Sequence, residues 1–126
     1  VGIMFDADLL SDDPKVHKQT ALPNDVAEVM DWLKEARIDE PQQVRSSGNG
    51  LYLDWLFEKP VTFRTGTERQ DFSAKVRLFH RMLRTKALEM RGWKFDNTDD
   101  LPRVTRMPGT LNHKTNPPKL VELLNV

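Results

Sequence analysis

The chain has 126 residues, enough for one domain, and no cysteine, which excludes disulfide bonds and thiolate metal sites. Its 19 basic and 19 acidic side chains give a formal net charge of +0, which argues against a protein that coats nucleic acid by bulk charge. No apolar run approaches the roughly 20 residues of a membrane span and no signal-peptide pattern is present, so we expect a cytoplasmic protein without a membrane partner.

The first half of the chain predicts a strand, a helix and a hairpin. Apolar and polar residues alternate over residues 2–8, which favours a strand, and a polar loop follows. Apolar residues then recur at helical spacing from Pro23 to about Arg37. Residues 43–47 and 51–57 predict two strands joined by the turn SGNG, because Asn-Gly is the strongest two-residue hairpin signal.

The second half predicts a long helix and short extended pieces. An amphipathic stripe that starts at Phe72 predicts a helix that stops at Gly92. Residues 103–107 favour a short strand or helix, residues 108–110 a Pro-Gly turn, and residues 119–124 a closing strand.

This β-α-β-β-α-β order predicts an α+β fold, a split βαβ or RRM-like module. Its sheet would be mixed or antiparallel, with the helices packed on one face. We expect a single domain over residues 1–126. A domain that opens on a strand with two carboxylates is unusual, so we expect that an N-terminal element is missing or comes from another chain.

Two aspartates lie on the first predicted strand, in the stretch FDAD. Asp6 and Asp8 are two residues apart, so they share one face of the strand. Hard carboxylate oxygens of this kind suit Mg²⁺, although a solvated pair at a strand end is the simpler interpretation.

The turn SSGNG opens the third predicted strand. Gly48 and Gly50 can adopt backbone angles that leave successive amides exposed, which would make an anion-binding nest. Taken alone, a plain hairpin loop is the more common explanation. On the strand that follows, Tyr52 and Asp54 share the face opposite the apolar side chains.

A basic stretch without acids runs from Leu101 to Val121 and contains RVTRMPGTLNHK. Arg103 and Arg106 are three residues apart and would point together in a helical turn. Arginine suits phosphate because its planar fork donates two parallel hydrogen bonds. A basic surface loop with a structural Pro-Gly turn remains the alternative.

Together these three stretches resemble the archaeo-eukaryotic primase superfamily, specifically the primase-polymerase domains of replication proteins from phages, plasmids and related mobile elements. In the family's order they are FDAD on a strand, SSGNGLYLDWLF, and RVTRMPGTLNHK after an acidic residue. The last is close to the family's Arg-h-h-Arg-h-Pro-Gly-Thr-h-Asn-x-Lys, where h is apolar, and is the most specific of the three. The resemblance spans nearly the whole chain.

The resemblance implies a DNA primase or DNA polymerase, a template-directed nucleotidyltransferase that uses Mg²⁺ or Mn²⁺. Its partners would be a DNA template, NTP or dNTP, and a replicative helicase. Asp6 and Asp8 would hold the metal ions with a third acid, for which Asp96 is the first choice and Asp99 and Asp100 compete.

The same resemblance assigns further site residues. The nucleotide would be bound by Ser47, Gly48, Gly50, Tyr52, Arg106 and Lys114. The nucleic acid would be contacted by Arg103, Asn112 and His113.

The second motif departs from the family at two positions. Tyr52 stands where the family usually has histidine, and a neutral tyrosine can donate one hydrogen bond but carries no positive charge. Asp54 replaces an aromatic residue and would repel a triphosphate unless a metal ion or an arginine offsets it.

Two other functions fit the same residues. One is a nucleic-acid-binding or nucleotide-binding module of the same fold without catalysis. The other is a metal-dependent nuclease, since paired aspartates serve that chemistry as well.

Overall fold

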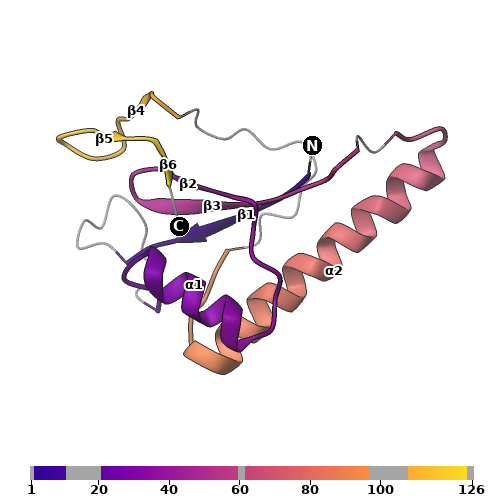
Figure 1. The fold of residues 1–126 in the computed structure, drawn as a ribbon, viewed down its shortest axis with the longest axis horizontal. Coiled ribbons are helices and arrows are strands. Elements are labelled where there is room, and N and C mark those ends of the chain that lie inside the picture. Colours follow the sequence, from indigo (N-terminus) through magenta and orange to yellow (C-terminus); the bar gives the residue numbers. More distant parts are fainter. Residues whose placement is uncertain (1, 11–20, 60–61, 97–107, 125–126) are drawn as a thin grey trace.

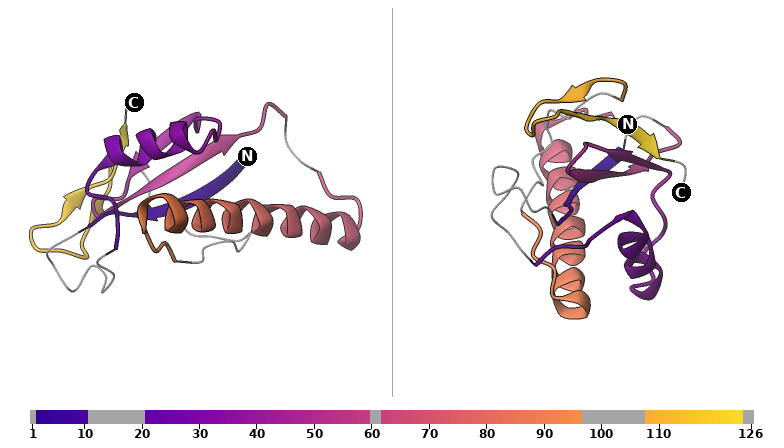
Figure 2. Two further views of the ribbon diagram at one scale, coloured as in Figure 1. Left: turned by 90° about the horizontal axis from the view of Figure 1, so that it is seen from below. Right: turned by 90° about the vertical axis from the view of Figure 1, so that its left-hand side faces the viewer.

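The structure is a computed structural model that describes residues 2–10, 21–59, 62–96 and 108–124. A four-stranded antiparallel sheet carries two helices on one face (Figures 1 and 2). The strands of this sheet are β1 (Gly2–Asp8), β2 (Gln43–Ser46), β3 (Gly50–Leu56) and β6 (Glu122–Leu124). The helices are α1 (Val26–Glu35) and α2 (Gly66–Arg91). A separate two-stranded pair consists of β4 (Leu111–Asn112) and β5 (Lys119–Leu120).

The expected α+β class is confirmed, and the sheet is antiparallel in the order β1-β3-β2-β6. The first three strands have the order of a split βαβ unit, in which β3 lies between β1 and β2. The RRM-like arrangement is not confirmed, because β6 pairs with β2 through Val44 and Leu124 instead of extending the sheet beside β1.

The alternation predicted for the two long strands is confirmed. Phe5, Ala7, Leu51 and Leu53 are buried beneath the helices and form one core with residues of α1 and α2. Because side chains alternate along a strand, the residues between them lie on the opposite face of the sheet. That face carries the polar residues of the first two motifs.

Helix α1 starts where a capping residue and an apolar stripe coincide. The Asp25 side chain accepts a hydrogen bond from the Glu28 amide (3.0 Å), which satisfies one of the free donors of the first turn. Val29, Trp32 and Leu33 then face the core and are fully buried.

Helix α2 starts earlier than its apolar stripe predicts. Thr65 caps it by accepting a hydrogen bond from the Glu68 amide (3.1 Å), so the helix begins at Gly66 and not at Phe72. The first turns are exposed and polar, and this end of the helix extends beyond the sheet (Figures 1 and 2). The apolar periodicity of the sequence does not reveal these first turns of α2, because their side chains are exposed.

The end of α2 is fixed by Gly92, which has a φ of 70°. Its amide donates to the Leu88 carbonyl (3.0 Å), and the chain turns back toward the core. Trp93 and Phe95 are therefore buried, with Phe95 packed edge to face against Phe5 at 5.5 Å between ring centroids.

The closing strand predicted over residues 119–124 is divided into two. Val121 is fully buried and leaves the ladder, because its amide donates to the Thr110 carbonyl (2.8 Å) and its carbonyl accepts from the Gly109 amide (2.8 Å). Residues before it therefore pair with β4, and residues after it pair with β2. The element predicted at residues 103–107 lies outside the described residues.

Among the residues that the structure describes, neither helix combines the length and apolar character needed to cross a membrane.

We expect Gly92→Ala to lower the free energy of unfolding by about 1 kcal/mol, since an alanine at φ 70° carries the cost of the left-handed conformation. Gly66→Ala is the matched control, because nothing lies within 4 Å of the added methyl group and no positive φ is required there. Urea unfolding followed by circular dichroism measures both. Equal losses in the two variants would contradict this account of the helix end.

Candidate functional site

The sheet face opposite the helices brings residues of the first two motifs together. Asp6 lies opposite Tyr52 in the β1–β3 register, and Asp8 lies opposite Gly50. Tyr52 in turn lies opposite Arg45 of β2. Directly opposed residues of antiparallel strands point to the same side, so the side chains of Asp6, Asp8, Tyr52 and Arg45 share one face. The two aspartates are half-buried and lie at the β1 edge of that face.

Arg45 offsets the charge that Asp54 adds to this face. Its Nε donates to Asp54 Oδ2 at 2.8 Å and its Nη2 to Oδ1 at 3.0 Å, which makes a two-pronged ion pair. The two side chains are only 12% and 10% exposed. The guanidinium also lies over the Tyr52 ring, 4.7 Å from its centroid.

Sequence reasoning left Arg45 out of the site. The signal that could have found it is the hairpin register, which sets Arg45 opposite Tyr52 and one step diagonally from Asp54. A positive charge therefore lies beside Tyr52, although Tyr52 itself carries none.

The turn SSGNG is the predicted hairpin connection between β2 and β3. Gly48 adopts a φ of 95°, and the Ser47 amide donates to the Gly50 carbonyl (2.9 Å). The Gly48 amide donates to Ser46 Oγ (3.1 Å). The Gly48 amide, one of the two assigned to an anion nest, thus serves the turn itself, while the Ser46 hydroxyl keeps its own proton available as a donor.

The third motif is anchored on this turn through Asn112. Its Nδ2 donates to the Ser47 carbonyl at 2.6 Å, and its Oδ1 accepts from the Lys114 amide at 3.0 Å. Asn112 is 2% exposed, so both of these bonds are buried or nearly so. Within the described residues, Asn112 therefore joins the β4–β5 hairpin to the SSGNG turn and does not face solvent.

Gly48 makes this close approach possible. A Cβ at position 48 would lie 2.7 Å from the Lys119 Cβ and 3.6 Å from the Asn112 Cβ. A contact of 2.7 Å is closer than two carbon atoms can pack, so a side chain here would push β5 away.

Asp8 lies at the same end of the sheet. A Cβ at Gly50 would lie 3.5 Å from Asp8 Oδ1 and 3.1 Å from the Ala7 carbonyl oxygen. The Leu9 amide, just after β1, also donates to the Asn49 carbonyl at 3.3 Å. The end of β1, the SSGNG turn and the β4–β5 hairpin are therefore neighbours, although they are far apart in the sequence.

The remaining predicted residues are placed in part. His113 and Lys114 are exposed in the turn after β4, beside the buried Asn112. Asp96 is exposed and follows Phe95, which packs against β1. The other predicted acids and arginines lie outside the described residues: Asp99, Asp100, Arg103 and Arg106.

In the described part of the chain, no three histidine or acidic side chains are grouped so that they could hold a metal ion. Among the described carboxylates, Asp6 and Asp8 therefore stay the predicted metal ligands. The structure does not bring Asp96 into a group with them.

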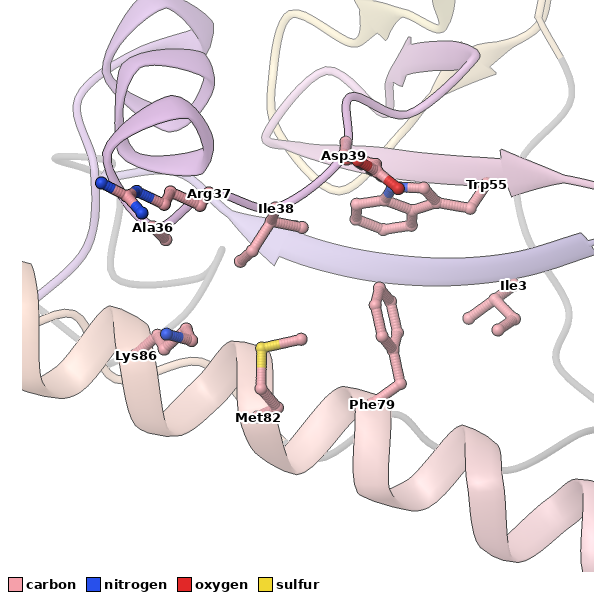
Figure 3. A pocket seen from close by; sticks show the side chains of 9 residues that line it. All are labelled: Ile3, Ala36, Arg37, Ile38, Asp39, Trp55, Phe79, Met82 and Lys86. Atoms are coloured by element: carbon pink, nitrogen blue, oxygen red, sulfur yellow. Dashed lines mark hydrogen bonds between the residues drawn. The ribbon is translucent and has the colours of Figure 1, made fainter.

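Two hollows lie on opposite faces of the sheet. One of about 280 Å³ adjoins the Arg45–Asp54 pair on the polar face, next to Met4 and Gln43. The other, of about 450 Å³, lies on the helix side and is mainly apolar (Figure 3). It is lined by Ile3, Ala36, Arg37, Ile38, Asp39, Trp55, Phe79, Met82 and Lys86. The site residues of the three motifs do not reach this second hollow.

No family model, no curated protein and no solved structure matches the chain. We therefore infer the function from the arrangement of its own residues.

We expect Gly48→Ala to be more damaging than Gly109→Ala. Both positions have a positive φ, 95° and 88°, so both variants carry the cost of a left-handed alanine, about 1 kcal/mol. Only at Gly48 does the new methyl group also meet a neighbour, because nothing lies within 4 Å at Gly109. The measurements are urea unfolding and hydrogen exchange of the Asn112 side-chain amide, which should lose protection in Gly48→Ala alone.

We expect Arg45→Met and Asp54→Asn each to lower the free energy of unfolding by about 2 to 4 kcal/mol, because each removes one partner of a nearly buried ion pair. The double variant should lose clearly less than the sum of the two, as for any directly coupled pair. A double-mutant cycle in urea measures the coupling. Additive losses would show that the ion pair does not stabilise this face.

Proposed function

We propose that the chain is a template-directed nucleotidyltransferase, a DNA primase or DNA polymerase that acts in the replication of a mobile element beside a helicase. The observation that supports this most is the meeting of three distant segments at one end of the sheet. Asp8 lies against Gly50, and Asn112 bonds to Ser47 in the same turn. These are the segments whose residues resemble the primase motifs.

In this proposal the aspartates of β1 are the metal ligands. Asp6 and Asp8 are half-buried and share one strand face, and their hard oxygens fit Mg²⁺ or Mn²⁺. Bound there, such ions would activate the attacking hydroxyl and neutralise the leaving pyrophosphate. The third acid would be Asp96, Asp99 or Asp100.

The turn and the hairpin would hold the triphosphate. The Ser46 and Ser47 hydroxyls suit phosphate oxygens, and Gly50 keeps the space beside Asp8 open. Lys114 is exposed two residues after the buried Asn112 and would add a positive charge to the site. Arg106 would add a second positive charge. Asn112 would act by position, since its amide is engaged with Ser47. Arg103 and His113 would contact the template.

Arg45 offsets the negative charge that Asp54 brings to the second motif. Paired with Asp54 and stacked on Tyr52, it removes the repulsion that an isolated carboxylate would exert on a triphosphate. The site would then be a reshaped version of the family's, with a fixed arginine beside a neutral tyrosine.

Two other functions use the same residues. A binding module without catalysis would keep its affinity for nucleic acid or nucleotide when the aspartates are changed. A metal-dependent nuclease would degrade the template strand in the presence of the same ions.

We expect Asp6→Asn and Asp8→Asn each to lower incorporation of labelled nucleotide by roughly a hundredfold or more, since each loses a charged metal ligand. Asp31→Asn, at an exposed position of α1, is the matched control and should be unaffected. The assay is primer synthesis and extension on single-stranded DNA with Mg²⁺ or Mn²⁺, together with Mn²⁺ binding followed by electron paramagnetic resonance. Full incorporation by either β1 variant, or loss of the template strand in the wild type, would contradict the proposal.

A further inference from the structure

We propose that one flank of α2 is a second nucleic-acid-binding surface, which contacts the phosphodiester backbone on the helix side of the sheet. We define the α2 flank as Arg77, Arg81 and Arg84 with the neighbouring Lys94. It lies on the opposite side of the sheet from Asp6, so it is distinct from the candidate site.

The charge of this stretch differs from that of the chain. Between Asp71 and Glu89 there are five basic residues and no acidic one, while the whole chain has a formal net charge of +0. Helix α2 thus concentrates positive charge that is balanced elsewhere. A local excess of this kind raises the concentration of a polyanion near the surface.

Helical geometry puts three of the cations in one row. Arg77, Arg81 and Arg84 follow the spacing i, i+4, i+7, so their side chains share one side of the helix. The core side is formed by other positions, among them Val76 and Leu83, which are buried. The row spans about 10 Å along the axis, over which each strand of a DNA duplex carries about three phosphates.

Arg77 and Arg81 are exposed and available to a ligand. Neither forms an ion pair with any of the described residues. Arg77 donates a long hydrogen bond of 3.4 Å from Nη2 to Ser73 Oγ within its own helix. Desolvating these two groups would break no strong interaction with the part of the chain that the structure describes.

A hollow of about 250 Å³ continues the row toward the end of the helix. It is lined by Arg84, Thr85, Leu88, Trp93, Lys94 and Phe95. Arg84 belongs to both the row and the hollow, and Lys94 is a second cation in the lining. Cations beside apolar and aromatic side chains are better suited to bind a sugar-phosphate backbone than to bind an isolated anion.

A nucleic acid fits the α2 flank better than a membrane does. A helix that lies on a membrane needs its apolar face at the lipid, whereas the apolar face of α2 is used by the core. The repeated one-turn spacing of arginines also matches a periodic chain of phosphates. The inference needs neither metal nor nucleotide, so it does not rest on the proposed catalysis.

The test compares Arg77→Gln/Arg81→Gln with Lys34→Gln/Lys59→Gln, which removes the same charge at exposed positions elsewhere. Binding to labelled single-stranded and duplex DNA of about 20 nucleotides is followed by fluorescence anisotropy in EDTA, at roughly 50 to 200 mM salt. We expect the α2 variant to bind about tenfold more weakly at 100 mM salt, with a salt dependence shallower by about one to two phosphate contacts. Its helix content and unfolding midpoint should match the control.

Three results would overturn the inference: no DNA binding by the wild type, equal losses in both variants, or tighter binding to polyglutamate or to anionic phospholipid vesicles than to DNA. Loss of nucleotide incorporation in the β1 aspartate variants would not bear on this inference, because fluorescence anisotropy in EDTA measures DNA binding alone.

Discussion

The pairing of β1 with β3 is the constraint on which the rest of the structure depends. It runs from Gly2 opposite Leu56 to Asp8 opposite Gly50 without a bulge. A slip of β1 by one residue would turn Phe5 and Ala7 out of the core and the aspartates into it. One register therefore fixes the core and the polar face together, and it fixes how far Asp8 lies from the glycine turn.

The second constraint is the buried link between Asn112 and Ser47. It joins residues 65 positions apart, and both groups lie where water does not replace a lost partner. Leaving a buried amide or carbonyl unpaired costs about 1 to 3 kcal/mol, which is enough to hold a short hairpin in place. Gly48 allows β5 to approach the turn closely, and the hydrogen bond from the Asn112 side-chain amide to the Ser47 carbonyl holds the hairpin there.

The charges of this neutral chain are arranged in two different ways. On the polar face, Arg45 and Asp54 neutralise each other beside Tyr52, so that face is ordered by paired charges. On α2, the arginines stand in a row without acids between them. Paired charges fix side chains in place, whereas a local excess of positive charge attracts an outside polyanion. The net charge of the chain reveals neither the paired charges of the polar face nor the row of arginines on α2.

The sequence by itself determined which side chains share a face, where the hairpin turns and where the helices lie, apart from the first turns of α2. Alternation at β1 and β3, the Asn-Gly turn and the Gly92 stop are local signals, because each depends on residues a few positions apart. The polar stretches that contain Asp6, Asp8, Ser47 and Asn112 stand out in the sequence for the same reason.

Only the tertiary structure decided which strand edges meet and which side chains find partners. The place of β6 beside β2, the break at Val121 and the Arg45–Asp54 pair depend on contacts between distant segments. The burial of Asn112 has the same origin. The spacing of apolar residues in the sequence does not specify these pairings between distant segments. They are selected by the free energy of packing and not by local conformation.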